Sequence, residues 1–289
     1  MRYAFIQAHR HEWPVGVMCE LMAVSVSGYY AWQGRPESER EQANQVLSEA
    51  IQQTWERSRK TYGSPRMHQQ LNQDGVPCGR HRVARLMREH GLKARSGRGY
   101  TPHGTDSRHD SPIAANVLNQ EFTANAPNEK WVCDMTFIAT QEGWLYLAVV
   151  MDLFSRRIIG WAMSTMCDAA LVMAALHMAQ GCRHAPPGVL VHSDRGSQYA
   201  SQDHRDMLNG LGFLQSMSRT GNCYDNAAME SFFSTLKFEC ANHKEGYLTR
   251  ALARTDIFDY IEVFYNRLRL HSSLSFNSPI HFEQAARLP

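Results

Sequence analysis

Three acidic residues carry the strongest chemical signal in this sequence: Asp134 in WVCDMTF, Asp194 in VHSDRGSQY and Glu230 in DNAAMESFFSTLKFE. Thirty-five residues separate Asp194 from Glu230. Two aspartates on strand ends and a glutamate on a helix form the oxygen ligand set that two divalent ions require. Two such ions activate an attacking oxygen and stabilise a leaving oxygen, so the pattern indicates cleavage and joining of phosphodiester bonds.

We expect Asp134 to bridge two Mg²⁺ ions, with Mn²⁺ as a workable substitute, and Asp194 and Glu230 each to complete one ion. Each acid taken singly also has a structural interpretation, since Asp194 before Arg195-Gly196 is typical of a turn and Glu230 of a solvated helix face. The apolar neighbours of Asp134 oppose that interpretation, because a half-buried carboxylate needs a cation or hydrogen bonds. Asp225, just before the helix of Glu230, is expected to be its N-cap.

The elements that must position these acids follow from the hydrophobic pattern between residues 131 and 239. Three β-strands joined by short connections predict an antiparallel meander, and helices then alternate with two more short strands. This α/β order is typical of the ribonuclease H-like fold. The predicted strands are 131–140, 144–152, 156–164, 188–194 and 213–217, and the predicted helices are 168–180, 202–211 and the one that carries Glu230.

The N-terminal part of the chain is predicted to be all helical. Two short helices within residues 15–33 form one helix-turn-helix candidate. A second candidate starts with a helix over 44–57, continues from Ser64-Pro65, where a capping hydroxyl precedes a proline, and ends with a helix over 80–90. In that last helix, Val83, Leu86, Met87 and His90 are expected to face inward, leaving Arg82, Arg85 and Arg88 for DNA phosphates.

The net charge of +2 is unevenly distributed. Residues 57–108 hold twelve Lys/Arg against three Asp/Glu, whereas residues 121–289 hold fourteen against seventeen. A basic module joined to a nearly neutral one favours a DNA-binding part and a catalytic part, although a solvated basic surface would look the same. The expected domains are a small helical region (1–40), a helix-turn-helix-like DNA-binding domain (41–95), a basic linker (96–124) and a ribonuclease H-like core with a C-terminal helical extension (125–289).

Cysteine usage and hydropathy indicate the cellular compartment in which the protein resides. The seven cysteines are scattered and form no CxxC pair, which is typical of reduced thiols. The longest apolar runs have the length of a strand, and the first residues are too polar for a signal peptide. We therefore expect a cytoplasmic protein without a membrane partner.

Six phrases spread over nearly the whole chain resemble one family. The chain resembles the transposases of the IS-three family of bacterial insertion sequences, in the part encoded by the second reading frame. The phrases are SVSGYYAW, RKTYGSPRM, WVCDMTF, VHSDRGSQY, GNCYDNAAMESFFSTLKFE and YNRLRLHSSL. The resemblance implies a retroviral-integrase-like core whose acidic triad maps onto Asp134, Asp194 and Glu230.

The resemblance also implies DNA partners. Lys237 matches the basic residue that follows the glutamate in such enzymes, and Arg66 lies in the helix-turn-helix-like phrase; Arg195, beside Asp194, is a further candidate DNA contact. The expected partners are the element's terminal inverted repeats, target DNA, other copies of this chain, and the product of the upstream reading frame as a fusion or separate chain. In this family that upstream part usually supplies a helix-turn-helix and a leucine zipper.

Two alternatives share parts of this pattern. A ribonuclease H-like nuclease that cuts without joining would use the same carboxylates. A non-catalytic DNA-binding regulator would explain the helix-turn-helix candidates, but it would place acids beside phosphates without benefit. Near the C-terminus, Asn266, Arg269 and His271 are candidate DNA contacts, although packing of that segment against the core is the favoured interpretation.

Overall fold

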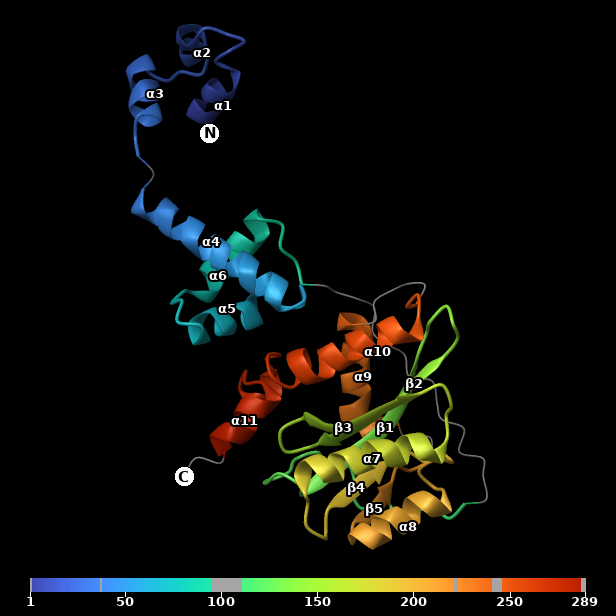
Figure 1. Cartoon of the computed structure of the whole chain (residues 1–289). Helices are drawn as coiled ribbons and strands as arrows, with labels where there is room; N and C mark the ends of the chain where they lie inside the picture. Colours follow the sequence, from blue (N-terminus) through green and yellow to red (C-terminus); the bar gives the residue numbers. More distant parts are fainter. Residues whose placement is uncertain (1, 37, 95–110, 221–222, 241–245, 287–289) are drawn as a thin grey trace. The chain divides into compact units, whose positions relative to one another are not determined.

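Figure 1 shows a computed structural model of the chain, which describes residues 2–36, 38–94, 111–220, 223–240 and 246–286. The chain divides into two compact units, Met1–Gln52 and Gln53–Pro289, and the division falls within helix α4 (Glu39–Arg57). Of the expected basic linker, residues 95–110 lie outside the described part. The expected domain limits stay a prediction.

The first unit opens with three short helices around a small core. They are α1 (Arg2–His9), α2 (Val15–Leu21) and α3 (Val26–Gln33). Ile6, Met18, Cys19 and Tyr29 are buried together between them. Ser25 begins α3, because its hydroxyl accepts a hydrogen bond from the Gly28 N–H at 3.0 Å. The predicted helix pair within residues 15–33 is confirmed, and α1 precedes it.

The second unit begins with the helix-turn-helix-like pair α5 (Ser64–Gln73) and α6 (Arg80–Glu89). The expected serine cap was wrong: Gly63 is the N-cap, no side chain caps the helix, and Ser64 is its first residue. Gly91 follows α6 with φ +66°, as predicted for a residue just past a helix end. Val83, Leu86 and Met87 are buried, but His90 is exposed, so its inward orientation was also wrong.

A five-stranded mixed sheet forms the centre of the α/β part, with the strand order β3-β2-β1-β4-β5. The first three strands pair antiparallel, as the short connections predicted, and β4 and β5 run parallel to β1. β1 therefore lies at the centre of the sheet. The strands are β1 (Lys130–Ile138), β2 (Leu145–Asp152), β3 (Arg157–Ser164), β4 (Leu190–Ser193) and β5 (Leu214–Met217).

Helices cover this sheet. α7 (Ala169–Arg183) lies across β2 and β3, and α8 (Gln202–Leu211) packs beside β5 (Figure 1). The helix–sheet core contains Trp131, Ala148 and Val150, while the alternate residues of the same strands are buried as well, so both faces of the sheet are covered. At Gly160 on β3, a Cβ atom would stand 2.2 Å from the Ala175 carbonyl oxygen of α7. Only glycine allows this close approach of helix and strand.

The C-terminal part consists of helices that return to the core. A 3₁₀ turn (Cys223–Asn226) leads into α9 (Ala227–Glu239), which contacts β1. α10 (Arg250–Phe258) continues as a π-helical segment (Asp259–Tyr265).

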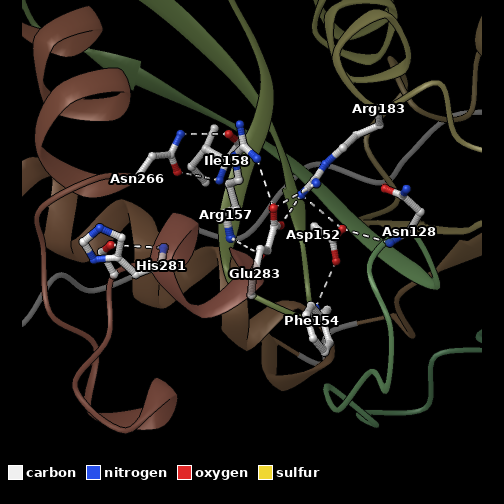
Figure 2. Close-up of polar contacts among 11 residues, drawn as sticks. Asn128, Asp152, Phe154, Arg157, Ile158, Arg183, Asn266, His281 and Glu283 are labelled. Atoms are coloured by element: carbon white, nitrogen blue, oxygen red, sulfur yellow. Dashed lines mark hydrogen bonds and ion pairs between the residues drawn. The ribbon is translucent and has the colours of Figure 1, made fainter. Parts of the chain in front are cut away.

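The last helix, α11 (Pro279–Ala286), is anchored by a buried ionic cluster (Figure 2). Glu283 bonds to Arg183 of α7 and, at 3.0 Å, to Arg157 of β3. Arg183 also lies 3.4 Å from Asp152 of β2, whose other carboxylate bonds come from the Asn128 and Phe154 N–H groups. α11 is thus linked directly to β3 and α7, and through Arg183 to β2.

The segment between α4 and α5 contacts this C-terminal part. Arg59 forms ion pairs with Asp256 and Asp259, and its guanidinium lies 5.6 Å from the Tyr260 ring centroid. The Tyr62 hydroxyl donates to the Leu268 carbonyl and accepts from the Leu270 N–H. Within the described part of the chain, no helix has both the length and the apolar character needed to cross a bilayer.

Candidate active site

Asp134 lies in the middle of the central strand, so its expected position at a strand end was wrong. It is half-buried on β1, next to the buried Cys133, and pairs with Val149 of β2. Its Oδ1 accepts a hydrogen bond from the Met135 N–H at 2.8 Å. A side chain on a strand paired on one edge by β2 and partly on the other by β4 has little freedom to move, which suits a group that must hold its position.

Asp194 lies directly after β4, the parallel neighbour of β1. Its Oδ1 accepts from the Gly196 N–H at 3.0 Å, so this carboxylate does form the turn bond expected from the Asp-Arg-Gly phrase. The turn and a position at the end of a strand are compatible, because the carboxyl ends of parallel strands are where ligands gather in open α/β sheets.

Glu230 lies in the first turn of α9 and is half-buried. The core-facing residues Phe232, Phe233 and Leu236 hold the helix in place. At its start, the Asn226 side chain donates to the Cys133 carbonyl at 3.3 Å. That bond ties the helix of Glu230 to the strand residue adjacent to Asp134. This role of Asn226 was not predicted and has no local signal in the sequence, because its partner lies 93 residues away.

The charges of Asp194, Glu230 and Lys237 all act on Asp134. Burial raises the pKa of Asp134 well above its usual range, and the charges of Asp194 and Glu230 raise it further. The Met135 N–H and Lys237 act in the opposite direction. Burial also raises the pKa of Glu230 and lowers that of Lys237, whose ammonium Asp134 stabilises. The proton affinity of Asp134 is thus high chiefly because its carboxylate is buried, and the neighbouring negative charges add to this effect.

The donor set fits a hard divalent cation. Carboxylate oxygens are the ligands that Mg²⁺ and Mn²⁺ prefer, and a cation would relieve the repulsion among the three acids. Among the residues that the structure describes, however, no group of three or more His, Cys, Asp or Glu side chains is spaced to hold one ion. The carboxylates therefore share an electrostatic environment without forming a closed chelate.

Asp225 has a different role from the predicted one. It does not cap α9: Asn226 is the N-cap residue, and no side chain makes a capping bond there. Asp225 is instead buried in the 3₁₀ turn, where Arg219 donates to it from its backbone and its guanidinium, and Asn116 and Gln120 donate from their amides. These bonds, with that of Arg219 largest, hold the pKa of Asp225 well below its usual range.

The candidate DNA contacts lie in two places. On α6, Arg88 is exposed, Arg82 is half-buried, and Arg85 lies 2.8 Å from Glu89 in a salt bridge. On α5, Arg66 is half-buried, with its guanidinium 6.0 Å from the Tyr62 ring centroid. Their positions on the helix-turn-helix-like pair are as expected.

The other two candidates lie near the acids. Arg195 donates to the Ser218 carbonyl and the Thr220 hydroxyl, both at 2.6 Å, so part of its guanidinium holds the segment after β5. Lys237 lies on α9, two turns beyond Glu230, with its ammonium 4.8 Å from the Phe137 ring centroid.

The C-terminal candidates are packing residues, which confirms the favoured interpretation. Asn266 is buried and exchanges two hydrogen bonds with the backbone of Ile158 on β3. Arg269 is buried in a bidentate ion pair with Glu239, the last residue of α9. His271 is buried against the Tyr265 ring.

Comparison with known proteins places the chain in a family. Residues 124–223 and 230–286 match the family "Integrase core domain", and residues 41–100 match the family "HTH-like domain". The chain is 42% identical to "Transposase InsF for insertion sequence IS3A" of Escherichia coli (strain K12), over 98% of each chain. The chain belongs to the IS-three (IS3) family of insertion-sequence transposases. This transposase is also 44% identical, over 92% of its length and 97% of the relative, to the "Insertion element IS600 uncharacterized 31 kDa protein" of Shigella sonnei.

Among solved structures, a simian T-cell lymphotropic virus intasome in complex with PP2A regulatory subunit B56 gamma matches 77% of this chain and 72% of its own, with 16% identity and a TM-score of 0.49.

The family establishes the function and the fold. The transposase is a DDE-type enzyme with an integrase-type core and a helix-turn-helix-like domain, and its chemistry is phosphodiester cleavage and strand transfer on DNA. The integrase core family is metal-dependent. The expected fold class and function are confirmed, and no observation favours a nuclease that only cuts or a regulator that only binds.

Proposed function

We propose that Asp134, Asp194 and Glu230 are the catalytic triad of this transposase. The observation that carries the proposal is where the fold places them: Asp134 lies on β1, Asp194 directly after the parallel neighbour β4, and Glu230 in the first turn of α9, which contacts β1. Burial, and then the charges of the other two acids, raise the pKa of Asp134. Three negative groups gathered in a partly desolvated place destabilise a fold unless they serve a cation. A protein that only binds DNA gains nothing from them.

The triad would hold two Mg²⁺ ions, or Mn²⁺ in their place, with Asp134 as the shared ligand. When bound, the ions would supply Lewis-acid stabilisation of the negative charge on the attacking and leaving oxygens. Rigid placement is the contribution of the protein: β1 fixes Asp134, the turn bond to Gly196 fixes Asp194, and the Asn226–Cys133 bond fixes the start of α9.

The reaction has two steps at one site. Water attacks the phosphodiester at an element end and breaks its P–O3′ bond, which frees a 3′ hydroxyl. That hydroxyl then attacks another DNA phosphate and displaces the 3′ oxygen of that strand. Neither step needs a covalent bond between the enzyme and DNA. Lys237, close enough to Asp134 to act on its charge, would contact a phosphate beside the scissile bond. Arg195 would contact the same strand, and Arg66, Arg82, Arg85 and Arg88 would bind the terminal repeat.

Two ends must be brought together before joining, so we propose that several copies of the chain assemble on DNA. The upstream reading-frame product, fused or separate, would add end recognition and part of the assembly surface.

The test is a strand-transfer assay on labelled element-end DNA with Mg²⁺ or Mn²⁺, comparing the unsubstituted chain with Glu230→Gln. Loss of one ligand of the catalytic ions should lower the joining rate on the order of 100-fold or more. The exposed helix residue Asp203 offers a matched control, since Asp203→Asn removes a carboxylate away from the triad and should leave the rate unchanged.

Joined products that persist in Glu230→Gln would overturn the assignment. If neither protein joins DNA, the assay is repeated with the upstream frame fused; joining that then appears and is lost in Glu230→Gln supports both the triad and the upstream partner.

A further inference from the structure

Two aromatic side chains are exposed side by side at the end of the β1–β2 connection. Phe137, near the end of β1, is 40% exposed, and Trp144, just before β2, is 50% exposed. Their rings meet edge to face with centroids 5.0 Å apart and an interplanar angle of 76°. The pair keeps a large flat apolar surface in solvent, although burying it would be favourable.

Cations flank this pair. The Lys237 ammonium lies 4.8 Å from the Phe137 ring centroid, and Arg250, the first residue of α10, donates from Nε to the Trp144 carbonyl at 3.3 Å. The nearby Glu142 carboxylate accepts a hydrogen bond from the Arg250 N–H at 2.8 Å, so the negative charge of Glu142 lies at the N-terminus of α10. An aromatic surface beside cations is the combination that binds single-stranded nucleic acid.

The pair also adjoins the candidate active site. Phe137 is three residues beyond Asp134 on the same strand, so the two side chains leave it on opposite faces. Lys237 links the two places, because it lies on α9 two turns beyond Glu230 and its ammonium is 4.8 Å from the Phe137 ring centroid. A DNA strand whose phosphate reaches the carboxylates would thus have its neighbouring nucleotides close to these rings.

A second edge-to-face pair in the same unit provides a comparison. Phe258 is 50% exposed and lies 6.0 Å from Trp161, at 69°. The polar neighbours of that pair differ, because Trp161 donates to the carboxylate of Glu262 at 2.8 Å, and Asp259, next to Phe258 in the chain, is ion-paired with Arg59. A carboxylate bonded to the aromatic pair is unfavourable beside a DNA phosphate, so aromatic exposure alone does not make a nucleic-acid site.

We propose that Phe137 and Trp144 form a stacking platform for unpaired nucleotides of the DNA strand that enters the carboxylate site. The bases would lie on the rings, and Lys237 and Arg250 would stand beside the phosphates. Stacking would compensate for the unpairing of the terminal base pairs next to the scissile phosphate. The inference rests on the proposed site, and its test uses binding, which does not require the triad to be catalytic.

The first measurement is photo-crosslinking on the unsubstituted full chain. A single-stranded oligonucleotide with a photoreactive 5-iodouracil base should crosslink to the peptides that hold Phe137 and Trp144, and the fully paired duplex of the same sequence should crosslink there much less. Crosslinks that map elsewhere, or equally for both DNAs, would overturn the proposal.

The second measurement compares affinities of variants for the same two DNAs by fluorescence anisotropy. Phe137→Ala and Trp144→Ala should weaken single-strand binding on the order of tenfold while changing duplex binding much less. Trp144→Phe should retain most of the affinity, and the matched control Phe258→Ala should change neither. Equal losses for both DNAs, or unchanged affinities, would contradict stacking. So would loss of self-association in Trp144→Ala with single-strand binding intact, which would make the pair an interface between copies.

Failure of this inference and failure of the triad are distinguishable. If the Glu230→Gln variant still joins DNA, the proposed triad is refuted. If the Phe137 and Trp144 variants bind single-stranded DNA normally, only the proposed stacking site is refuted.

Discussion

Asp225 lies five residues before Glu230, yet its carboxylate serves the fold and not the chemistry. Its bond partners are Arg219, Asn116 and Gln120, and the last two lie 109 and 105 residues away in the chain. The same residue type thus has opposite environments at Asp134 and Asp225: acids surround the first, and donors surround the second. This difference in neighbours, and not burial alone, distinguishes the candidate metal ligand from the structural acid.

The lowered pKa of Asp225 predicts a pH dependence. A carboxyl whose pKa is lower in the folded state stabilises the fold above its unfolded pKa, and this contribution is lost as pH falls below about 4. Asp225→Asn should therefore lower the free energy of unfolding by about 1–3 kcal/mol at neutral pH, and this difference should shrink on acidification. Denaturant unfolding over a pH series measures it, with Asp203→Asn as the unaffected control. A difference that does not change with pH would contradict the explanation.

At the scale of elements, the contact between β3 and α7 depends on one missing side chain. A Cβ at Gly160 would collide with the backbone of Ala175 and Ala179, which cannot move without shifting the helix. α7 in turn carries Arg183, which holds Glu283 of the last helix and lies beside Asp152 (Figure 2). A shift of α7 would therefore disturb both the sheet and the attachment of α11.

Two glycine substitutions test this contact against each other. Gly160→Ala should destabilise the fold by about 1–3 kcal/mol through overpacking. Gly181→Ala, on the exposed side of α7 with no atom near the added Cβ, should instead stabilise by about 0.5–1 kcal/mol because alanine favours the helix. Thermal unfolding of both variants measures these changes in stability. Equal effects of the two substitutions would show that helix propensity, and not the close approach, determines the result.

At the scale of the whole molecule, charge is divided between the DNA-binding and the catalytic parts. Residues 57–108 are strongly basic, whereas residues 121–289 are slightly acidic. The catalytic core therefore cannot attract DNA by net charge, and the basic part must supply most of the electrostatic affinity. In the proposed site, local cations such as Lys237 would then position the strand at the carboxylates.

This division predicts how salt affects binding. Affinity for duplex DNA should fall as salt rises, and Arg88→Ala, which removes an exposed charge of α6, should reduce the slope of log affinity against log salt by about one. Arg205→Ala is the control, because Arg205 lies on α8 among the exposed acids Asp203 and Asp206. A slope that changes equally in both variants would place the DNA contact elsewhere.

Much of the fold was accessible from the sequence because its signals are local. The helix over 202–211 coincides with α8, and the antiparallel meander followed from short connections between apolar runs. Local signals also misled: Ser64 and Asp225 have the right types for caps, but Gly63 and Asn226 occupy those positions. Side-chain capping competes with tertiary partners, and at Asp225 the tertiary partners prevailed. A C-terminal helical extension was expected, but neither the bounds of α10 nor the π-helical form of the segment after it was predicted.

The sequence by itself determined the element types, the basic and acidic parts, and the motifs that hold the three candidate acids, because periodicity and spacing act between near neighbours in the chain. Only the tertiary structure decided which groups meet. The Asn226–Cys133 bond, the Arg269–Glu239 pair and the exposed Phe137–Trp144 platform join residues on different elements. Such contacts depend on how packed elements cross, and the pattern within any one element leaves that crossing undetermined.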